Sequence, residues 1–146
     1  MRRSLDAHEI NEVINHPEVF PWVKIDGMNH VDLSPLVADR KNYMLMDEGG
    51  GFFFHWIEKC VYEVHTQFIP GQNPNILAAA VNAVRWMFEH TDAAEIYTEV
   101  PQDNIRARKL TRRTGFEYVT TVKNGWMRDG RNLDVDLFVL EKDKCP

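Results

Sequence analysis

Three polar side chains occupy alternate positions of a short segment between residues 61 and 69: Glu63, His65 and Gln67. Alternate residues of an extended strand point to the same face, so the three would lie together. A histidine titrates near neutrality, and a glutamate can accept a proton when its pKa is raised or when water relays the proton. The pattern predicts a proton-accepting site with Glu63 and His65 as catalytic candidates. The alternative is a solvated strand face.

A second candidate site lies just after this strand, where Gly71-Gln72-Asn73-Pro74-Asn75-Ile76 leads into a helical pattern. We expect Asn73 to cap the helix and Pro74 to occupy its first position. Free backbone N–H groups and the helix dipole make such a start attractive to a diphosphate, although Pro74 has no N–H to donate. The alternative is a core helix with a polar cap.

The segment from residue 104 to residue 114 predicts a strongly basic helix. Its cations are Arg106, Arg108, Lys109, Arg112 and Arg113. These cations either form a solvated face of the helix or attract phosphate groups. The formal net charge of −5 and the pI of about 5.6 argue against broad nucleic-acid binding, which needs a basic surface.

Other chemistries find little support in the sequence. The six histidines do not fall at a recognised metal-ligand spacing, so we expect no metal, although Cys60 between His55 and His65 makes zinc conceivable. Cys60 and Cys145 form no CxxC pair and are interpreted as reduced thiols of a cytoplasmic protein. The N-terminus does not resemble a signal peptide, and no apolar run is long enough for a membrane span.

The first half of the 146-residue chain predicts short helices followed by strands. Asp6 and Glu9 form a capping-box pattern before a short helix that Pro17 ends. Residues 18–35 predict loops and a short helical piece. Strands are expected at 43–47, 52–58 and 61–69, with the glycines of residues 49–51 forming a turn.

The second half alternates helices and strands. Apolar residues at helical spacing predict a long helix from about residue 75 to residue 90. The remaining expected elements are a strand at 95–100, a helix at 104–114 and strands at 116–127 and 133–141. Asp129-Gly130 predicts a hairpin turn, and Asn124-Gly125 is either a competing turn or a bulge. We therefore expect one domain, residues 1–146, of the α/β (α+β) class. Its mixed sheet would contain an antiparallel N-terminal meander, a central β-α-β step and a C-terminal hairpin.

Two blocks of sequence carry a resemblance to a known family. The first runs from Glu63 to Pro70 and continues into the following helix. The second contains Val100-Pro101-Gln102-Asp103-Asn104, then Ala107, Leu110 and Gly115-Phe116. Together they resemble the Gcn5-related N-acetyltransferase (GNAT) superfamily, whose second block usually reads N-x-x-A-x-x-L-Y-x-x-x-G-F. The layout, including residues 49–54, resembles short acetyltransferase-like proteins often carried by bacteriophages.

This resemblance implies a GNAT fold and transfer of an acetyl group from acetyl-CoA to an amine. The acceptor would be a small molecule, a protein N-terminus or a lysine. It favours Glu63 as general base, and it allows a homodimer through the last strands. The cofactor-binding positions it implies are Phe68, Ile69, Gly71, Gln72, Asn73, Asn75, Ile76, Asn104 and Arg108.

Two positions depart from the family pattern. Asn73-Pro74 stands where the family has an Arg-Gly pair, and Thr111 stands where it has a tyrosine that protonates the leaving thiolate. Tyr97 or Tyr118 could replace that tyrosine, or the thiolate could leave unassisted. The alternative function is a non-catalytic GNAT-like module for binding or assembly.

Overall fold

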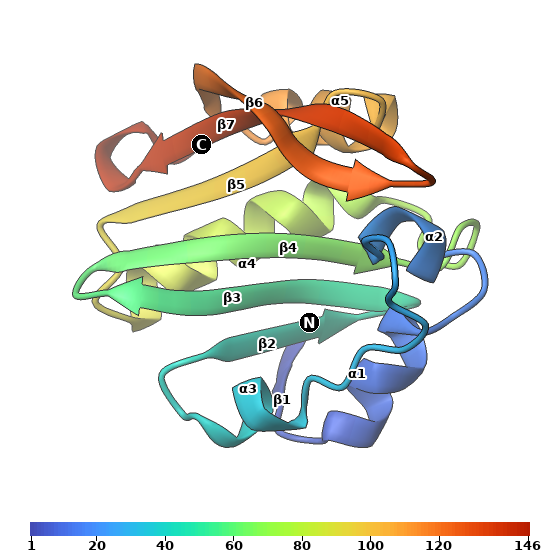
Figure 1. Ribbon diagram of the computed structural model, residues 1–146. Helices are drawn as coiled ribbons and strands as arrows, with labels where there is room; N and C mark the ends of the chain where they lie inside the picture. Colours follow the sequence, from blue (N-terminus) through green and yellow to red (C-terminus); the bar gives the residue numbers. More distant parts are fainter.

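The computed structural model describes residues 1–146 and contains one seven-stranded sheet. Its order is β1-β2-β3-β4-β5-β7-β6, and only β4 and β5 are parallel neighbours (Figure 1). The strands are β1 (Arg2–Ser4), β2 (Tyr43–Asp47), β3 (Gly50–Glu58), β4 (Val61–Phe68), β5 (Glu95–Pro101), β6 (Glu117–Arg128) and β7 (Arg131–Glu141). The predicted mixed sheet is confirmed, with its meander, its central β-α-β step and its C-terminal hairpin.

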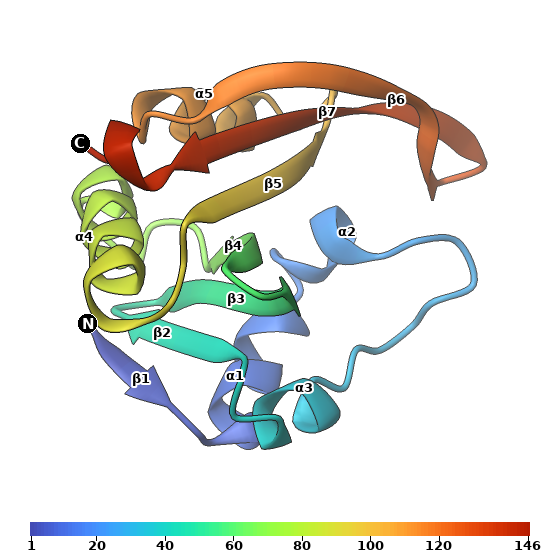
Figure 2. The same cartoon turned by 90° about the vertical axis from the view of Figure 1, so that its left-hand side faces the viewer.

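Helices cover both faces of the sheet (Figure 2). Three short helices, α1 (Ala7–Ile14), α2 (Phe20–Val23) and α3 (Ser34–Ala38), lie on one face. The longer α4 (Ile76–His90) and α5 (Ile105–Arg113) lie on the other, and a 3-10 turn, η1 (Lys142–Lys144), follows β7. None of these helices combines the length and the apolar character needed to cross a bilayer.

Each face of the sheet has its own apolar core. The larger core joins the sheet to α4 and contains Phe54, Met87 and Phe138, none of which is measurably exposed. The smaller core joins β2 and β3 to α1 and α3 through Ile10, Met44 and their neighbours. The alternation predicted for β4 follows from this arrangement, because Tyr62 and Val64 enter the larger core while Glu63 and His65 point away from it.

The start of the sheet differs from the sequence prediction in two places. β1 was not predicted, since three residues carry no readable period, yet it pairs with β2 from Arg2↔Met46 to Ser4↔Met44. The predicted three-glycine turn is wrong, because Gly50 and Gly51 belong to β3. A Cβ on Gly50 would lie 2.1 Å from the Gln67 carbonyl oxygen, so the missing side chain permits the close pairing with β4.

The predicted capping box at α1 is only half correct. The Asp6 side chain accepts a hydrogen bond from the His8 N–H, as a helix cap does. The Glu9 carboxylate does not return to the Asp6 N–H, which is bonded to the Ser4 hydroxyl. Glu9 instead accepts from Ser4 and pairs with Arg2, which joins α1 to β1.

The C-terminal hairpin resolves the competing turn signals. Asp129 and Gly130 form the turn, both with positive φ. Asn124 also has positive φ, but it lies inside β6 where the register with β7 shifts between Val122 and Trp126. Asn124-Gly125 is therefore part of a bulge.

The hairpin anchors the chain after α2, more than a hundred residues earlier in sequence. The Trp126 indole donates to the Lys24 carbonyl oxygen at 3.2 Å, and the Asp26 N–H donates to the Met127 carbonyl oxygen at 3.1 Å. The Gly130 N–H also donates to the Asp26 carboxylate. These bonds hold the segment around α2 beside the end of β4 (Figure 1).

Candidate active site

A fork between β4 and β5 is the central feature of the site. The two strands pair over only three positions, ending at Glu63↔Tyr97, although both continue beyond that point. β5 instead follows β7 along its whole length. Just past the last pair, the Thr98 hydroxyl donates to the Val64 carbonyl oxygen at 2.9 Å, so a side chain replaces the missing strand partner.

The fork leaves backbone donors of β4 without a neighbouring strand. The N–H and C=O groups of one residue point to the same side of an extended strand, and those of every second residue point the same way. Because the Val64 carbonyl faces β5, the N–H groups of Thr66 and Phe68 also face the fork. They are placed to bind a carbonyl or amide of a ligand lying between the strands.

Glu63 and His65 meet on the face of the sheet away from α4, as predicted. The His65 Nε2 lies 3.4 Å from the Glu63 Oε1, and the Tyr97 hydroxyl lies 3.5 Å from the Glu63 Oε2. Burial alone would raise the pKa of Glu63, but the hydrogen bonds and charges around it, led by those of His65, lower the pKa below its usual value. Glu63 is therefore a carboxylate at neutral pH. Of the two routes that the sequence analysis gave for Glu63, a raised pKa is not observed, and relay of the proton is the one that remains.

Sequence reasoning missed two further members of this cluster. His55 lies directly opposite Glu63 in the β3–β4 register, and Glu99 follows Tyr97 on the same face of β5. Burial, and then the charge of Glu63, raise the pKa of Glu99. Alternation along the strands could have indicated these residues. His55, for example, lies between the core residues Phe54 and Trp56, so its side chain must point to the opposite face of the sheet.

Helix α4, which follows the loop after β4, begins later in the sequence than predicted. Asn75 is the helix cap and accepts from the Ala78 N–H, so the assignment of Asn73 as cap and Pro74 as first helical residue is wrong. The Asn73 side chain donates to the Glu48 carbonyl oxygen and accepts from the Asn75 N–H. It therefore links the loop to the β2–β3 turn.

This loop still offers unpaired donors. The backbone N–H groups of Gly71, Asn73, Ile76 and Leu77 have no hydrogen-bond partner in the protein. Gly71 has a φ of +80° and open space around it, which suits a close approach by a ligand. No cationic side chain lies in residues 69–77. The loop presents amide hydrogens and a helix dipole, without side-chain charge.

The predicted cofactor residues of β4 and the loop lie close together. Phe68 ends β4 with its ring stacked edge-on against Phe52, at a centroid distance of 5.2 Å. The Ile69 N–H is bonded to the Gly49 carbonyl oxygen. The Gln72 side chain lies against Gly49, because a Cβ added to Gly49 would be only 2.5 Å from the Gln72 Cβ. The loop after β4 is therefore packed against the β2–β3 turn and bonded to it.

The two predicted cofactor residues on α5 have partners inside the protein. The Asn104 side chain caps α5 by accepting from the Ala107 N–H at 3.1 Å. The Arg108 guanidinium pairs with the Asp136 carboxylate at 3.1 Å, on the side of the sheet that faces α4. Asp136 is buried and also accepts from Gln102 and Thr121. Its ion pair with Arg108 is a non-local contact that sequence spacing could not indicate.

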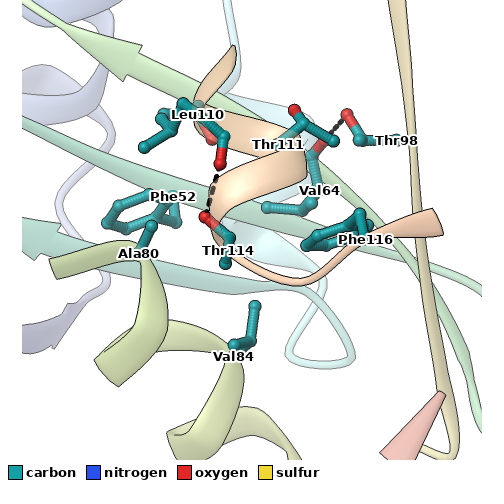
Figure 3. Close-up of a pocket in the computed structure, with 10 residues that line it drawn as sticks. Phe52, Val64, Ala80, Val84, Thr98, Leu110, Thr111, Thr114 and Phe116 are labelled. Atoms are coloured by element: carbon teal, nitrogen blue, oxygen red, sulfur yellow. Dashed lines mark hydrogen bonds between the residues drawn. The ribbon is translucent and has the colours of Figure 1, made fainter. Parts of the chain in front are cut away.

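A small cavity lies on the α4 side of the fork, and Figure 3 shows its lining. Its volume is about 30 Å³, and its walls come from β3, β4, α4, β5 and α5, with Phe116 closing one side. Buried Ala80 and Val84 form the floor, while Thr66 and Thr111, which are more exposed, lie at the rim. Thr111 thus borders the fork, at the position where the family pattern has a tyrosine.

The two tyrosines considered as replacements lie elsewhere. The Tyr97 hydroxyl faces Glu63, and burial together with the nearby carboxylates raises the pKa of Tyr97 to about 12. Tyr118 is 52% exposed on β6, with its hydroxyl bonded to that of Thr121. Neither shares the cavity with Thr111.

Comparison with known proteins gives a clear answer on the fold. No family model matches the sequence, and no curated protein matches it. Solved structures do match. A spermidine N-acetyltransferase from Vibrio cholerae, in complex with CoA and spermine, aligns with a TM-score of 0.79 at 15% identity, over 95% of this chain and 91% of that one.

Two other structures give the same result. A ribosomal-protein-S5-alanine acetyltransferase from Vibrio fischeri aligns with a TM-score of 0.75 at 16% identity, over 100% of this chain and 93% of the other. A probable acetyltransferase of the GNAT family from Chromobacterium violaceum aligns at 0.69 and 14% identity, over 94% and 78%. The resemblance to the GNAT superfamily that the sequence suggested is thereby confirmed at the level of structure: the chain has the GNAT fold.

Proposed function

We propose that this protein is an N-acetyltransferase that moves an acetyl group from acetyl-CoA to an amine. The observation that carries the proposal is the fork, which ends strand pairing at Glu63↔Tyr97 and leaves β4 amides free beside a helix start with unpaired N–H groups. The solved acetyltransferases of the same fold support it, one of them in complex with CoA. Acetyl-CoA would supply an acyl group activated as a thioester.

The donor set of the loop fits a phosphorylated ligand. The N–H groups of Gly71, Asn73, Ile76 and Leu77 and the α4 dipole can bind phosphate oxygens. Pro74 contributes no donor, so binding rests on its neighbours. The residues proposed to hold acetyl-CoA are Phe68, Ile69, Gly71, Gln72, Asn73, Asn75, Ile76, Asn104 and Arg108.

Glu63 and His65 are proposed to remove the proton from the acceptor ammonium. The low pKa of Glu63 suits a carboxylate that attracts the ammonium and passes its proton onward, through water or to the imidazole 3.4 Å away. The amine nitrogen is then free to form the C–N bond as the thioester C–S bond breaks. Thr111 is too weak an acid to protonate sulfur, so CoA would leave as a thiolate.

The acceptor is proposed to be a small-molecule amine, a protein N-terminus or a lysine. Glu63 and Glu99 give this face of the fork a negative character that suits a cation. The segment around α2, anchored to the β6–β7 hairpin, borders the face. We further propose a cytoplasmic protein, in keeping with the free thiols of Cys60 and Cys145, and a homodimer through β6 and β7 as one assembly it could form.

A thermal-shift measurement tests the proposal. At a concentration one hundred times its Kd, acetyl-CoA should add about 2.7 kcal/mol to the free energy of unfolding and raise Tm by roughly 8 °C. No shift at millimolar acetyl-CoA would contradict the proposal. It would favour the second candidate, a non-catalytic module of the same fold, for which Pro74 in the loop and Thr111 at the cavity rim are the supporting observations.

A matched pair of variants tests the amide donors themselves. Ile76 is the first residue of α4, where proline is tolerated because its missing N–H has no helical partner. Ile76→Pro removes one proposed phosphate donor and should weaken acetyl-CoA binding about tenfold, whereas Ile76→Val keeps the N–H and should not. Equal affinities of the two variants would remove this amide from the site.

A further inference from the structure

The interior of the fork cavity is apolar in spite of its threonines. The Thr98 hydroxyl donates to the Val64 carbonyl and the Thr114 hydroxyl donates to the Leu110 carbonyl at 2.8 Å (Figure 3). Both hydroxyls are therefore already bonded to the backbone. The polar groups still without a protein partner are the hydroxyls of Thr66 and Thr111 at the rim.

Such a cavity does not favour water. A buried water molecule needs two to four polar partners, and neither the floor of Ala80 and Val84 nor the Phe116 side offers any. An apolar group entering the cavity would gain contacts with these side chains and displace no well-bonded solvent. The occupant that suits it is a short hydrocarbon.

The cavity lies where the acyl group of a thioester would reach. Its lining residues Thr66 and Thr98 belong to the two strands of the fork, just beyond the last pair, Glu63↔Tyr97. Glu63 lies at this level on the opposite face of the sheet. If a thioester carbonyl lies between the strands, Glu63, the proposed proton acceptor, is on one side of the sheet, and the acyl carbon chain extends into the cavity on the other side.

The size of the cavity sets the length of that chain. Roughly 10–15 Å³ of such space holds one water-sized group, so a cavity of about 30 Å³ holds about two. An acetyl group has one carbon beyond its carbonyl, and a propionyl group has two. We propose that the cavity is an acyl-chain site that takes a propionyl group in preference to acetyl, with Thr111 at its rim.

This inference rests on the proposed function and changes only the acyl group. The reaction keeps its balance: the amine nitrogen forms a C–N bond to the acyl carbon, the thioester C–S bond breaks, and the ammonium proton goes to the Glu63–His65 side. The absence of a tyrosine at position 111 has a consequence here, because a phenol ring in place of the Thr111 side chain would extend toward the space that the longer chain uses.

Calorimetric titration of the intact protein with CoA, acetyl-CoA, propionyl-CoA and butyryl-CoA tests the proposal. Propionyl-CoA should bind about fourfold more tightly than acetyl-CoA, the effect of burying one methylene, and butyryl-CoA should lose that gain. Equal binding of all four ligands would overturn the acyl-chain site and leave CoA binding, and with it the proposed function, intact. Failure of CoA and of every thioester to bind would overturn both.

Two variants that change the cavity volume in opposite directions, together with one control, test whether the cavity causes the propionyl preference. Ala80→Val adds carbon atoms to the cavity floor and should abolish the propionyl preference, whereas Val84→Ala enlarges the floor and should move the preference to butyryl-CoA. Thr111→Val keeps the size of the rim and removes only a hydroxyl, so it should leave the preference unchanged. Loss of the preference in Thr111→Val would assign it to hydrogen bonding and overturn the volume argument. If a floor variant fails to fold, the wild-type series still decides.

Discussion

The two faces of the sheet at the fork carry opposite kinds of side chain. On the face covered by α4 and α5, apolar residues dominate, and the hydroxyls of Thr98 and Thr114 are bonded to carbonyl groups. On the other face, Glu63, Tyr97 and Glu99 have shifted pKa values, and the charge of His65 acts on both glutamates. A strand that lies between a core and a titratable surface can separate acyl binding from proton transfer, because its alternate residues serve different faces.

Two carboxylates sharpen this contrast. Glu63 and Asp136 both have pKa values below the usual range, but for different reasons. Asp136 is 2% exposed, and burial alone would raise its pKa, but the bonds from Gln102 and Thr121 and the charge of Arg108 lower it. Glu63 is partly exposed beside His65. The first stabilises the fold, and the second faces the space where an acceptor would lie.

The largest effect is expected for Glu63→Gln. The amide cannot accept the ammonium proton, so turnover should fall by about 10²- to 10⁴-fold while acetyl-CoA affinity stays within twofold. Initial rates with a panel of amines, together with a binding titration, measure both quantities. Gln67→Ala, on the same face of the same strand, is the control. Unchanged turnover in Glu63→Gln would remove this residue as the base.

Asp136→Asn should show the reverse pattern. Loss of the charge leaves Arg108 without its buried partner, so the free energy of unfolding should fall by about 3 kcal/mol, with little change in turnover at saturating acetyl-CoA. Because folding lowers the pKa of Asp136, its stabilisation is present above its unfolded pKa, near 3.9, and is lost as the pH falls through the folded value. Thermal melts should show the gap between wild type and variant closing below about pH 4. A gap independent of pH would contradict this assignment.

His65→Gln should have an intermediate effect. The bond and charge of His65 help to lower the pKa of Glu63, so their loss should raise it and move the acid limb of kcat/KM to higher pH. We expect a fall in turnover of about tenfold at neutral pH. His8→Gln, on exposed α1, is the matched control. An acid limb that stays in place would show that the two side chains act independently.

The smallest effect is expected for Tyr97→Phe. The hydrogen bond to Glu63 is long, at 3.5 Å, and is the last of the influences that lower the pKa of Glu63. Turnover should change by less than about threefold across neutral pH. A large loss would instead give the Tyr97 hydroxyl a direct part in the chemistry, since with a pKa of about 12 it remains a proton donor throughout that range.

Sequence patterns predicted those parts of the molecule that depend on local order. Alternation in β4 placed Glu63 and His65 together, and helical spacing found α4. The fork itself could not be predicted, because it depends on β5 pairing with β7, which begins at Arg131, far along the sequence from β5. The Arg108–Asp136 pair was missed for the same reason. The cap of α4 was misplaced by two residues, because Asn73 and Asn75 are equally good capping residues and only the geometry selects Asn75.

The last strand of the chain is an interior strand of the sheet. β7 lies between β5 and β6, so β6 has no backbone partner until residues 131–141 have been synthesised. A nascent chain on the ribosome, or one truncated near residue 130, would expose β6 as an unpaired strand and leave one side of β5 open. The protein should therefore tolerate loss of β1, at the rim of the sheet, far better than loss of residues 131–146.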